Sequence, residues 1–401
     1  MNKKNKRYLL ILLIYVAFIS LGLPDGLLGV AWPEMRNSFS LPLDALGLIL
    51  IGSTSGYLLS SFFNGYFIKK IGVAVLLSLS CLATGLALIA YTLVPYWWLL
   101  PLFAVVAGLG AGAIDAGLNT YVEKHFNEGL MQWLHASFGI GVTIGPIIMS
   151  SAITYSNSWR TGYLVVGTAQ ILLAIIFIIT LSLWKDPKNK KSGSTDKDKD
   201  YTKEVKIFET LTHLPALLSI FLFFIYTGIE MSLGHWAYTF FTESRAINTS
   251  TAGYMVSAYW GSFTAGRILA GFLAYKFLSH KIAKYAATLG VFGSALIAVN
   301  ISQWFSFFGI ILTGLAIAPI FPALISSTTH RVGKEYTTNT IGMQISAAGL
   351  GGALLPGLLG VLARNINLEI IPIFIMFLFI LFLTINNLIK KIKENAAKKA
   401  A

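Results

Sequence analysis

This sequence of 401 residues contains little charge and a single cysteine. Asp, Glu, Lys and Arg together make up 12% of the chain, about half the share of an average soluble protein, whereas apolar residues make up 55%. No soluble domain can bury that much hydrocarbon, so lipid must be the solvent for most of the chain. Cys81 lies in an apolar run, which excludes a disulfide-stabilised secreted scaffold.

Motifs for ATP hydrolysis, metal binding and nucleophilic catalysis are also missing. The sequence has no Gly-x-x-x-x-Gly-Lys-Ser/Thr loop, and its six histidines lack metal-ligand spacing. The run 52–56 has the spacing of a nucleophile elbow, but it lies inside an apolar segment without triad partners. We therefore expect no enzyme activity, no metal site and no cofactor.

Twelve apolar runs are long enough to cross a bilayer, which takes roughly 20 helical residues each. The sequence therefore predicts an all-α polytopic membrane protein with twelve transmembrane helices. Their ends are expected to be accurate to about two to four residues. The predicted spans are 8–35, 43–67, 72–92, 97–121, 131–154, 160–184, 212–240, 250–275, 281–300, 303–326, 336–362 and 368–390.

The basic residues predict how these helices are oriented. The net charge is +13, and 25 of the 30 Lys and Arg fall on one side of the membrane if both termini share that side. Positive residues concentrate in cytoplasmic loops, so both termini are predicted to be cytoplasmic in a cell inner membrane. The distribution of the basic residues thus reflects the membrane topology of the chain, and nucleic acid is excluded as a partner.

The two halves of the chain carry a weak internal repeat. An offset of 206 residues places Gly22 on Gly228 and Gly108 on Gly314. Two parallel six-helix repeats are the architecture of transporters whose site lies between two halves. The predicted domains are an N-terminal six-helix bundle (1–184), a cytoplasmic linker (185–211), a C-terminal six-helix bundle (212–390) and a basic cytoplasmic tail (391–401).

The topology and repeat resemble the major facilitator superfamily over nearly the whole chain. Gly65, Lys70 and Gly72 match the signature between its second and third helices, but Lys69 and Val73 replace the expected Asp and Arg. The resemblance implies the major facilitator fold, with two pseudo-symmetric bundles.

The fourth predicted helix resembles the fucose permease-like branch of sugar:proton symporters. Asp115 and Asn119 follow a Gly-rich stretch there, and Asp25 occupies the first helix. The run 228–236 is similar to the seventh helix of such permeases. This resemblance implies a sugar substrate without identifying the sugar.

Three acids lie within predicted spans, namely Asp25, Asp115 and Glu230. A charge at mid-bilayer costs about 2.5–3.5 kcal/mol on insertion scales, so each acid needs a partner, a water-filled cavity or a proton. We predict that they carry the coupling proton. The alternative is that they lie near helix ends and face water.

Several polar and aromatic side chains are candidates for holding a sugar. Asn119 lies one helical turn from Asp115, and amides suit sugar hydroxyls, although they also join membrane helices. His135 and Gln344 have the same two interpretations, and aromatic rings either stack on sugars or form interfacial belts. The predicted substrate residues are Asn119, His135, Trp236, Tyr259, Trp260 and Gln344.

Two basic residues are candidates for gating. Lys70 belongs to the signature loop, and Arg267 lies in the inner part of the eighth predicted helix. Arg267 either pairs with an acid or a gate carbonyl, or extends its guanidinium to the headgroups.

The sequence thus favours a secondary transporter that moves a monosaccharide or similar small polar solute by proton-coupled alternating access. The partners are then the sugar and membrane lipids, the chain is a monomer, and Na⁺ stays open as the coupling ion. The alternative is a proton-coupled exporter, either a drug or amphiphile antiporter or a glycolipid flippase, which the 27 Phe would suit. A receptor on a transporter scaffold is disfavoured because the predicted linker is too short for a signalling domain.

Overall fold

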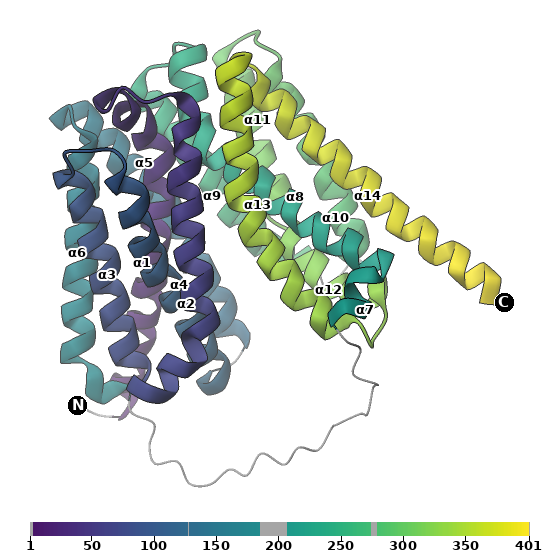
Figure 1. The fold of residues 1–401 in the computed structure, drawn as a ribbon, viewed down its shortest axis with the longest axis horizontal. Helices are drawn as coiled ribbons and strands as arrows, with labels where there is room; N and C mark the ends of the chain where they lie inside the picture. The colour runs from purple at the N-terminus through teal and green to yellow at the C-terminus, as the bar shows by residue number, and fades with distance from the viewer. Residues whose placement is uncertain (1–2, 127, 185–206, 274–278, 401) are drawn as a thin grey trace.

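The structure is a computed structural model that describes residues 3–126, 128–184, 207–273 and 279–400. Within these ranges the chain forms helices and no strand. The helices gather into two bundles, one from each half of the chain (Figure 1). The predicted linker residues 185–206 lie outside the described residues.

In the first bundle the helices pack in pairs, α1 against α5, α2 against α4, and α3 against α6. A short 3-10 turn, η1, precedes α2, and another, η2, follows α6. The elements are α1 (Lys3–Ser38), η1 (Leu43–Ala45), α2 (Leu46–Ile71), α3 (Val73–Leu93), α4 (Leu99–His125), α5 (Glu128–Ser156), α6 (Trp159–Ile179) and η2 (Leu181–Leu183).

The second bundle pairs α8 with α13, α10 with α11, and α9 with α11. A short helix, α7, precedes α8, and a π-helical turn, η3, follows it. The elements are α7 (Ile207–Thr212), α8 (Leu214–Thr239), η3 (Phe240–Ser244), α9 (Thr249–Leu273), α10 (Ser279–Ala298), α11 (Gln303–Ile317), α12 (Ile320–Val332), α13 (Thr337–Asn365) and α14 (Ile370–Ala400).

The predicted all-α membrane fold is confirmed, with two differences in the second half. The tenth predicted span is divided into α11 and α12 at Pro319, because proline lacks the N–H that would continue the helix. The residues predicted as a separate tail continue α14 as far as Ala400. Among the described residues, ten helical segments are long and apolar enough to cross a membrane.

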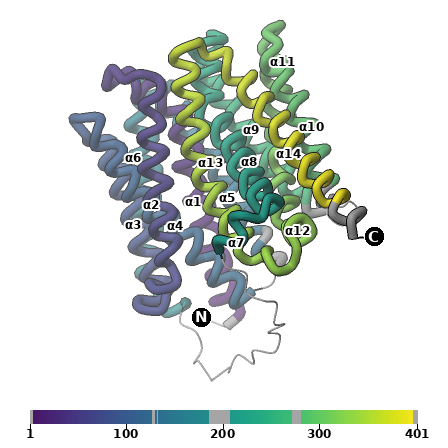
Figure 2. Tube along the Cα trace, turned by 45° about the vertical axis from the view of Figure 1, so that its right-hand side comes forward, coloured from purple at the N-terminus to yellow at the C-terminus, as the bar shows by residue number. Residues whose placement is uncertain are grey.

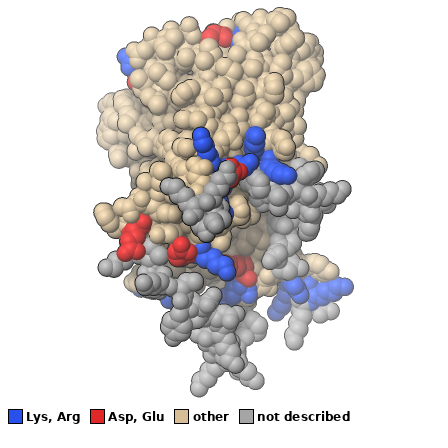
Figure 3. Space-filling model, turned by 90° about the vertical axis from the view of Figure 1, so that its right-hand side faces the viewer, with Lys and Arg blue, Asp and Glu red and all other residues tan. Residues whose placement is uncertain are grey.

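The outer surface of the bundles is apolar, as a lipid environment requires. Phe62, Phe292 and Ile179 are 82%, 62% and 74% exposed. In Figure 3 the upper part of the face shown is mostly uncharged, with a few charged residues at its top edge, and the other visible Lys, Arg, Asp and Glu lie from mid-height downward. Water would not favour such a surface, whereas a bilayer matches it.

The two bundles converge at one end and diverge at the other (Figures 1 and 2). We call the convergent end, with the turns 39–45, 240–248 and 366–369, the distal side, and the opposite end, where α1 begins, the termini side. A Cβ added to Gly47 of α2 would lie 3.3 Å from Cα of Gly357 in α13. Farther along the same helices, Gly65 and Gly342 have nothing within 4 Å of such a Cβ. The helices of the two halves therefore separate toward the termini side.

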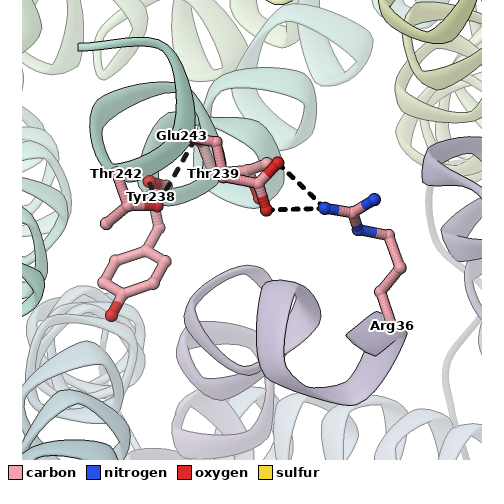
Figure 4. Close-up of polar contacts among 5 residues, drawn as sticks. All are labelled: Arg36, Tyr238, Thr239, Thr242 and Glu243. Carbon is pink, nitrogen blue, oxygen red and sulfur yellow. Dashed lines mark hydrogen bonds and ion pairs between the residues drawn. The ribbon is translucent and has the colours of Figure 1, made fainter. Parts of the chain in front are cut away.

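Two ion pairs join the halves on the distal side. Arg36 of α1 places Nη2 2.8 Å from Oε1 of Glu243 in η3 (Figure 4). Arg364 of α13 places Nη1 3.1 Å from Oδ1 of Asp44 in η1. Each pair has one partner in each bundle, so separating the halves on this side would break both.

A third ion pair lies within the second bundle on the distal side and should stabilise it. The Arg245 side chain is 4% exposed, and its Nη2 lies 2.6 Å from Oε2 of Glu369, whose Oε1 accepts a 2.6 Å hydrogen bond from Ser244. Partial burial alone would raise the pKa of Glu369, but the hydrogen bonds from Arg245 and Ser244 and the charge of Arg245 outweigh it, so this pKa lies below its ordinary value.

We expect Glu369→Gln to lower the melting temperature of the purified protein at neutral pH, because a buried guanidinium loses its counter-charge. A lowered folded-state pKa stabilises above the unfolded pKa, so the difference from wild type should shrink as pH falls from about 5 to 3. Thermal unfolding measured across this pH range tests the expectation. Glu209→Gln, at an exposed position of α7, is the matched control, and a pH-independent difference would contradict the assigned cause.

Candidate functional site

A carboxylate with two fixed hydrogen bonds lies in the interior of the first bundle. The Tyr57 hydroxyl donates to Oδ2 of Asp115, and Nδ2 of Asn119 donates to Oδ1 of Asp115 at 2.8 Å. All three side chains are partly exposed. The sequence prediction that Asp115 and Asn119 share a helical face is therefore confirmed as a direct contact.

Close packing of α2 against α4 brings Tyr57 to Asp115. A Cβ on Gly56 would lie 2.1 Å from the Val105 carbonyl oxygen, and one on Gly108 would lie 2.0 Å from that of Ser53. Any larger residue would push these backbones apart, so the Gly-rich stretch has a packing role. Tyr57 is not among the predicted site residues, although its place directly after Gly56 on a glycine-lined helix was an available signal.

Asp25 of α1 lies close enough to Asp115 and Glu230 to interact with both electrostatically. Among the described residues it has no hydrogen bond and no ion pair. All three predicted acids therefore lie in one region, contributed by α1, α4 and α8. Asp25 differs from the other two because no neighbouring side chain compensates its charge.

In the second bundle, Glu230 of α8 faces a basic partner. Nη2 of Arg267 in α9 is 4.0 Å from Oε1 of Glu230, and the guanidinium also lies 4.2 Å from the Phe263 ring centroid. The Tyr259 hydroxyl donates to the backbone oxygen of Glu230 at 2.9 Å. Arg267 thus pairs with an acid instead of extending toward headgroups.

His135 of α5 connects the two halves of this region. Its side chain is exposed, contacts the Phe18 ring edge-on at 5.8 Å between centroids, and interacts electrostatically with Arg267. The site accordingly has an acidic side in the first bundle and an Arg–Glu pair in the second.

Four predicted substrate residues are covered by protein in this conformation. Trp236, Tyr259, Trp260 and Gln344 are each at most 1% exposed. The Trp236 indole donates to the Pro356 carbonyl at 2.9 Å, and Oε1 of Gln344 accepts from Thr328 at 3.1 Å. Their part in substrate binding stays a prediction, because no face of these side chains is open here.

The remaining predicted gating residue, Lys70, is exposed at the termini-side end of α2. Its ammonium lies 5.7 Å from the Tyr66 ring centroid, and it has no ion pair among the described residues. The described part of the chain also holds no group of three or more His, Cys, Asp or Glu that could bind a metal ion.

Two helical membrane bundles with acidic and basic groups inside them are an arrangement typical of membrane transporters. The chain belongs to the Major Facilitator Superfamily, whose family model matches residues 14–356. The predicted family is thereby confirmed, and so is the prediction that the protein is not an enzyme.

Relatives and solved structures agree with this assignment. The glucose/mannose transporter GlcP of Bacillus subtilis is 25% identical over 354 residues, covering 86% of each chain. Sodium-dependent glucose transporter 1 of Homo sapiens is 24% identical over 396 residues, covering 87% of this chain and 73% of that one. A bacterial homologue of the human lysosomal transporter Spinster, in an inward-facing and occupied conformation, superposes with a TM-score of 0.79 at 13% identity, covering 97% of this chain and 98% of that one.

Proposed function

We propose that this chain takes up a monosaccharide or similar small polar solute across the cytoplasmic membrane by proton-coupled alternating access. The observation that carries the proposal is that relatives named as sugar transporters coincide with carboxyl groups inside the membrane-spanning helices α1, α4 and α8. A transporter that moves a neutral sugar uphill needs an ion to drive it, and a membrane-embedded carboxyl group is suited to carry a proton.

Asp115 is the leading proton carrier in this proposal. Its two oxygens each accept a hydrogen bond, from Tyr57 and Asn119, which fixes its position while its partial exposure leaves a path for protons. Asp25 lies close enough to Asp115 for the two carboxyl groups to interact electrostatically. Glu230 has a different role, because Arg267 already compensates it.

The substrate is proposed to bind between the bundles near the midplane, where such sites form in transporters of this kind. His135, Asn119 and Arg267 supply donors and acceptors on facing helices. The covered residues Trp236, Tyr259, Trp260 and Gln344 would take part only after the halves move.

The termini side is proposed to be cytoplasmic. Of the 30 Lys and Arg, 25 fall in segments that the sequence predicts to share the side of both termini, as the positive-inside rule requires of a cytoplasmic face. The convergent distal side would then face outward, and the conformation described here would admit solute from the cytoplasm. We further propose that the chain functions as a monomer.

Proteoliposomes loaded with a pH-sensitive dye test the function directly. Addition of the transported sugar from a panel of hexoses and pentoses should acidify the lumen, with uptake saturating in that sugar. Acidification by no sugar, together with movement of lipophilic cations or glycolipids against protons, would establish the exporter alternative. Omitting Na⁺ in parallel decides whether the ion is a proton, since the human relative is named a sodium-dependent transporter.

A further inference from the structure

The first bundle contains a small cavity beside Asp25, with a mostly apolar lining that includes a few polar side chains. Its volume is about 40 Å³, and α1, α2, α3, α4 and α6 surround it. One buried water needs roughly 10–15 Å³. A pocket for a small organic molecule measures at least about 300 Å³. The cavity therefore has room for an ion with one or two waters, and it is far too small for a sugar.

The polar part of the cavity lining consists of oxygen-bearing side chains. These residues are Asp25, Ser53, Thr84 and Gln170, and the rest of the lining is apolar. Among the described residues, no Lys, Arg or His lines this cavity. Asp25 has neither a hydrogen bond nor an ion pair to any other described side chain or backbone group, so its charge has no protein partner.

Gln170 lines this cavity, and a proline in α1 determines which end of its amide is left without a partner. Pro24 has no N–H, so the carbonyl of Ser20, four residues earlier in α1, lacks its usual helical donor. Nε2 of Gln170 donates to that carbonyl at 2.7 Å. A carbonyl can only accept, which assigns the nitrogen to Ser20 and leaves Oε1 as the free end. That oxygen is buried without a partner, in a residue that is 1% exposed.

Thr84 contributes a hydroxyl to the cavity that makes only one weak hydrogen bond elsewhere. The residue is 3% exposed, and Oγ1 makes only a long 3.4 Å bond to the Ala107 carbonyl. Its lone pairs are free to accept. The cavity thus brings together one carboxylate and several neutral oxygens that lack hydrogen-bond donors.

We propose that this cavity is a binding site for Na⁺, held by the Asp25 carboxylate, Oε1 of Gln170 and the Thr84 hydroxyl, with Ser53 at its edge. Hard cations prefer oxygen ligands of this kind. One carboxylate balances one positive charge, so a monovalent ion is neutralised whereas a divalent ion would leave an excess charge in the bundle. The ion also provides the partner that Asp25 otherwise lacks.

The second bundle does not repeat the site. At the offset of 206 residues, Gln170 corresponds to Met376 and Thr84 to Gly290. A Cβ on Gly290 would lie 2.3 Å from the Phe379 ring, so an aromatic side chain packs against that position. At these two positions the pseudo-symmetric scaffold carries oxygen-bearing side chains in the first half and none in the second, which argues that Gln170 and Thr84 are not a requirement of the fold.

Binding of ²²Na⁺ to the purified full chain tests the site. Wild type should show saturable binding that unlabelled Na⁺ displaces and K⁺ displaces at least tenfold less effectively. Gln170→Met, which installs the residue found in the second half, should weaken binding at least tenfold, and Thr84→Val and Asp25→Asn should do so as well. Ser78→Ala is the matched control, because Ser78 is a buried hydroxyl of α3 that donates to Ala174 away from the cavity.

Absence of saturable ²²Na⁺ binding to wild type would overturn the proposal and assign the cavity to water. Wild-type affinity in Gln170→Met would also overturn it. The proposed function assigns the driving role to a proton, so any effect of this Na⁺ on sugar movement rests on that function. Sugar counterflow, which needs no ion gradient, is therefore measured on the same preparations. Sugar counterflow without Na⁺ binding would contradict the Na⁺ site and support the transport function. Na⁺ binding without movement of any sugar would support the site and contradict the transport function. Retained counterflow in Gln170→Met shows that the variant is folded.

Discussion

Asp115→Asn is expected to abolish sugar accumulation while leaving sugar exchange intact. A proton moving down about 100 mV gains about 2.3 kcal/mol. At 1.4 kcal/mol per tenfold, this drives a roughly 50-fold concentration ratio. Without the titrating carboxyl group of Asp115, the ratio of internal to external sugar concentration should fall to about one. Uptake of radiolabelled sugar into energised vesicles, compared with counterflow in the same vesicles, measures both quantities.

The asparagine substitution isolates proton carriage from structure. Its amide oxygen can still accept from Asn119, and its amide nitrogen can donate to the Tyr57 hydroxyl, which accepts as well as it donates. The hydrogen-bonded geometry therefore survives, whereas the ability to bind a proton is lost. Equal loss of counterflow and accumulation would show that Asp115 is needed for folding or sugar binding instead.

Tyr57→Phe provides the matched comparison for this prediction. It removes one hydrogen bond from Asp115 but leaves the carboxyl group, so accumulation should persist at a reduced rate. A complete loss of accumulation in Tyr57→Phe would assign the tyrosine hydroxyl to the proton path. Together the two variants separate a proton carrier from a residue that positions it.

Reversing the charge of Arg36 is expected to open the distal side. Arg36→Glu replaces the inter-bundle ion pair with two facing carboxylates, the introduced one in α1 and that of Glu243 in η3. An exposed ion pair is worth about 0.2–1 kcal/mol, and like-charge repulsion adds to its loss. The equilibrium between the closed and the open distal side should therefore shift toward the open state by roughly tenfold. The second pair, between Asp44 and Arg364, limits the shift.

A cysteine at Ser257 reports this opening. Ser257 of α9 is 6% exposed, and its hydroxyl donates to the Thr143 carbonyl of α5 across the two bundles at 2.8 Å. In a Cys81→Ala background, Ser257→Cys should react with a water-soluble maleimide about tenfold faster when Arg36→Glu is present. The double variant Arg36→Glu with Glu243→Arg restores opposite charges and should return the rate to its original value. Unchanged labelling in Arg36→Glu would show that the ion pair does not hold the distal side closed.

The sequence predicted the helices of this protein well because hydropathy is a local property. A run of about 20 apolar residues must span a bilayer as a helix whatever its neighbours are. The one interrupted span, at Pro319, follows from proline chemistry that could have been applied at that position. The three membrane-embedded acids were visible for the same reason, since isolated charges stand out in apolar runs.

What the tertiary structure decided is how those side chains meet. Whether Asp115 contacts Tyr57 depends on the rotation and spacing of α2 and α4, and those depend on glycine contacts between residues far apart in the chain. The pairing of Glu230 with Arg267 and the orientation of Gln170 toward Ser20 likewise join separate helices. The sequence by itself determined that the chain crosses a membrane many times and carries charge inside it. Only the packing of helix on helix determined which charges are compensated, because contacts between helices depend on three-dimensional distances that no local pattern encodes.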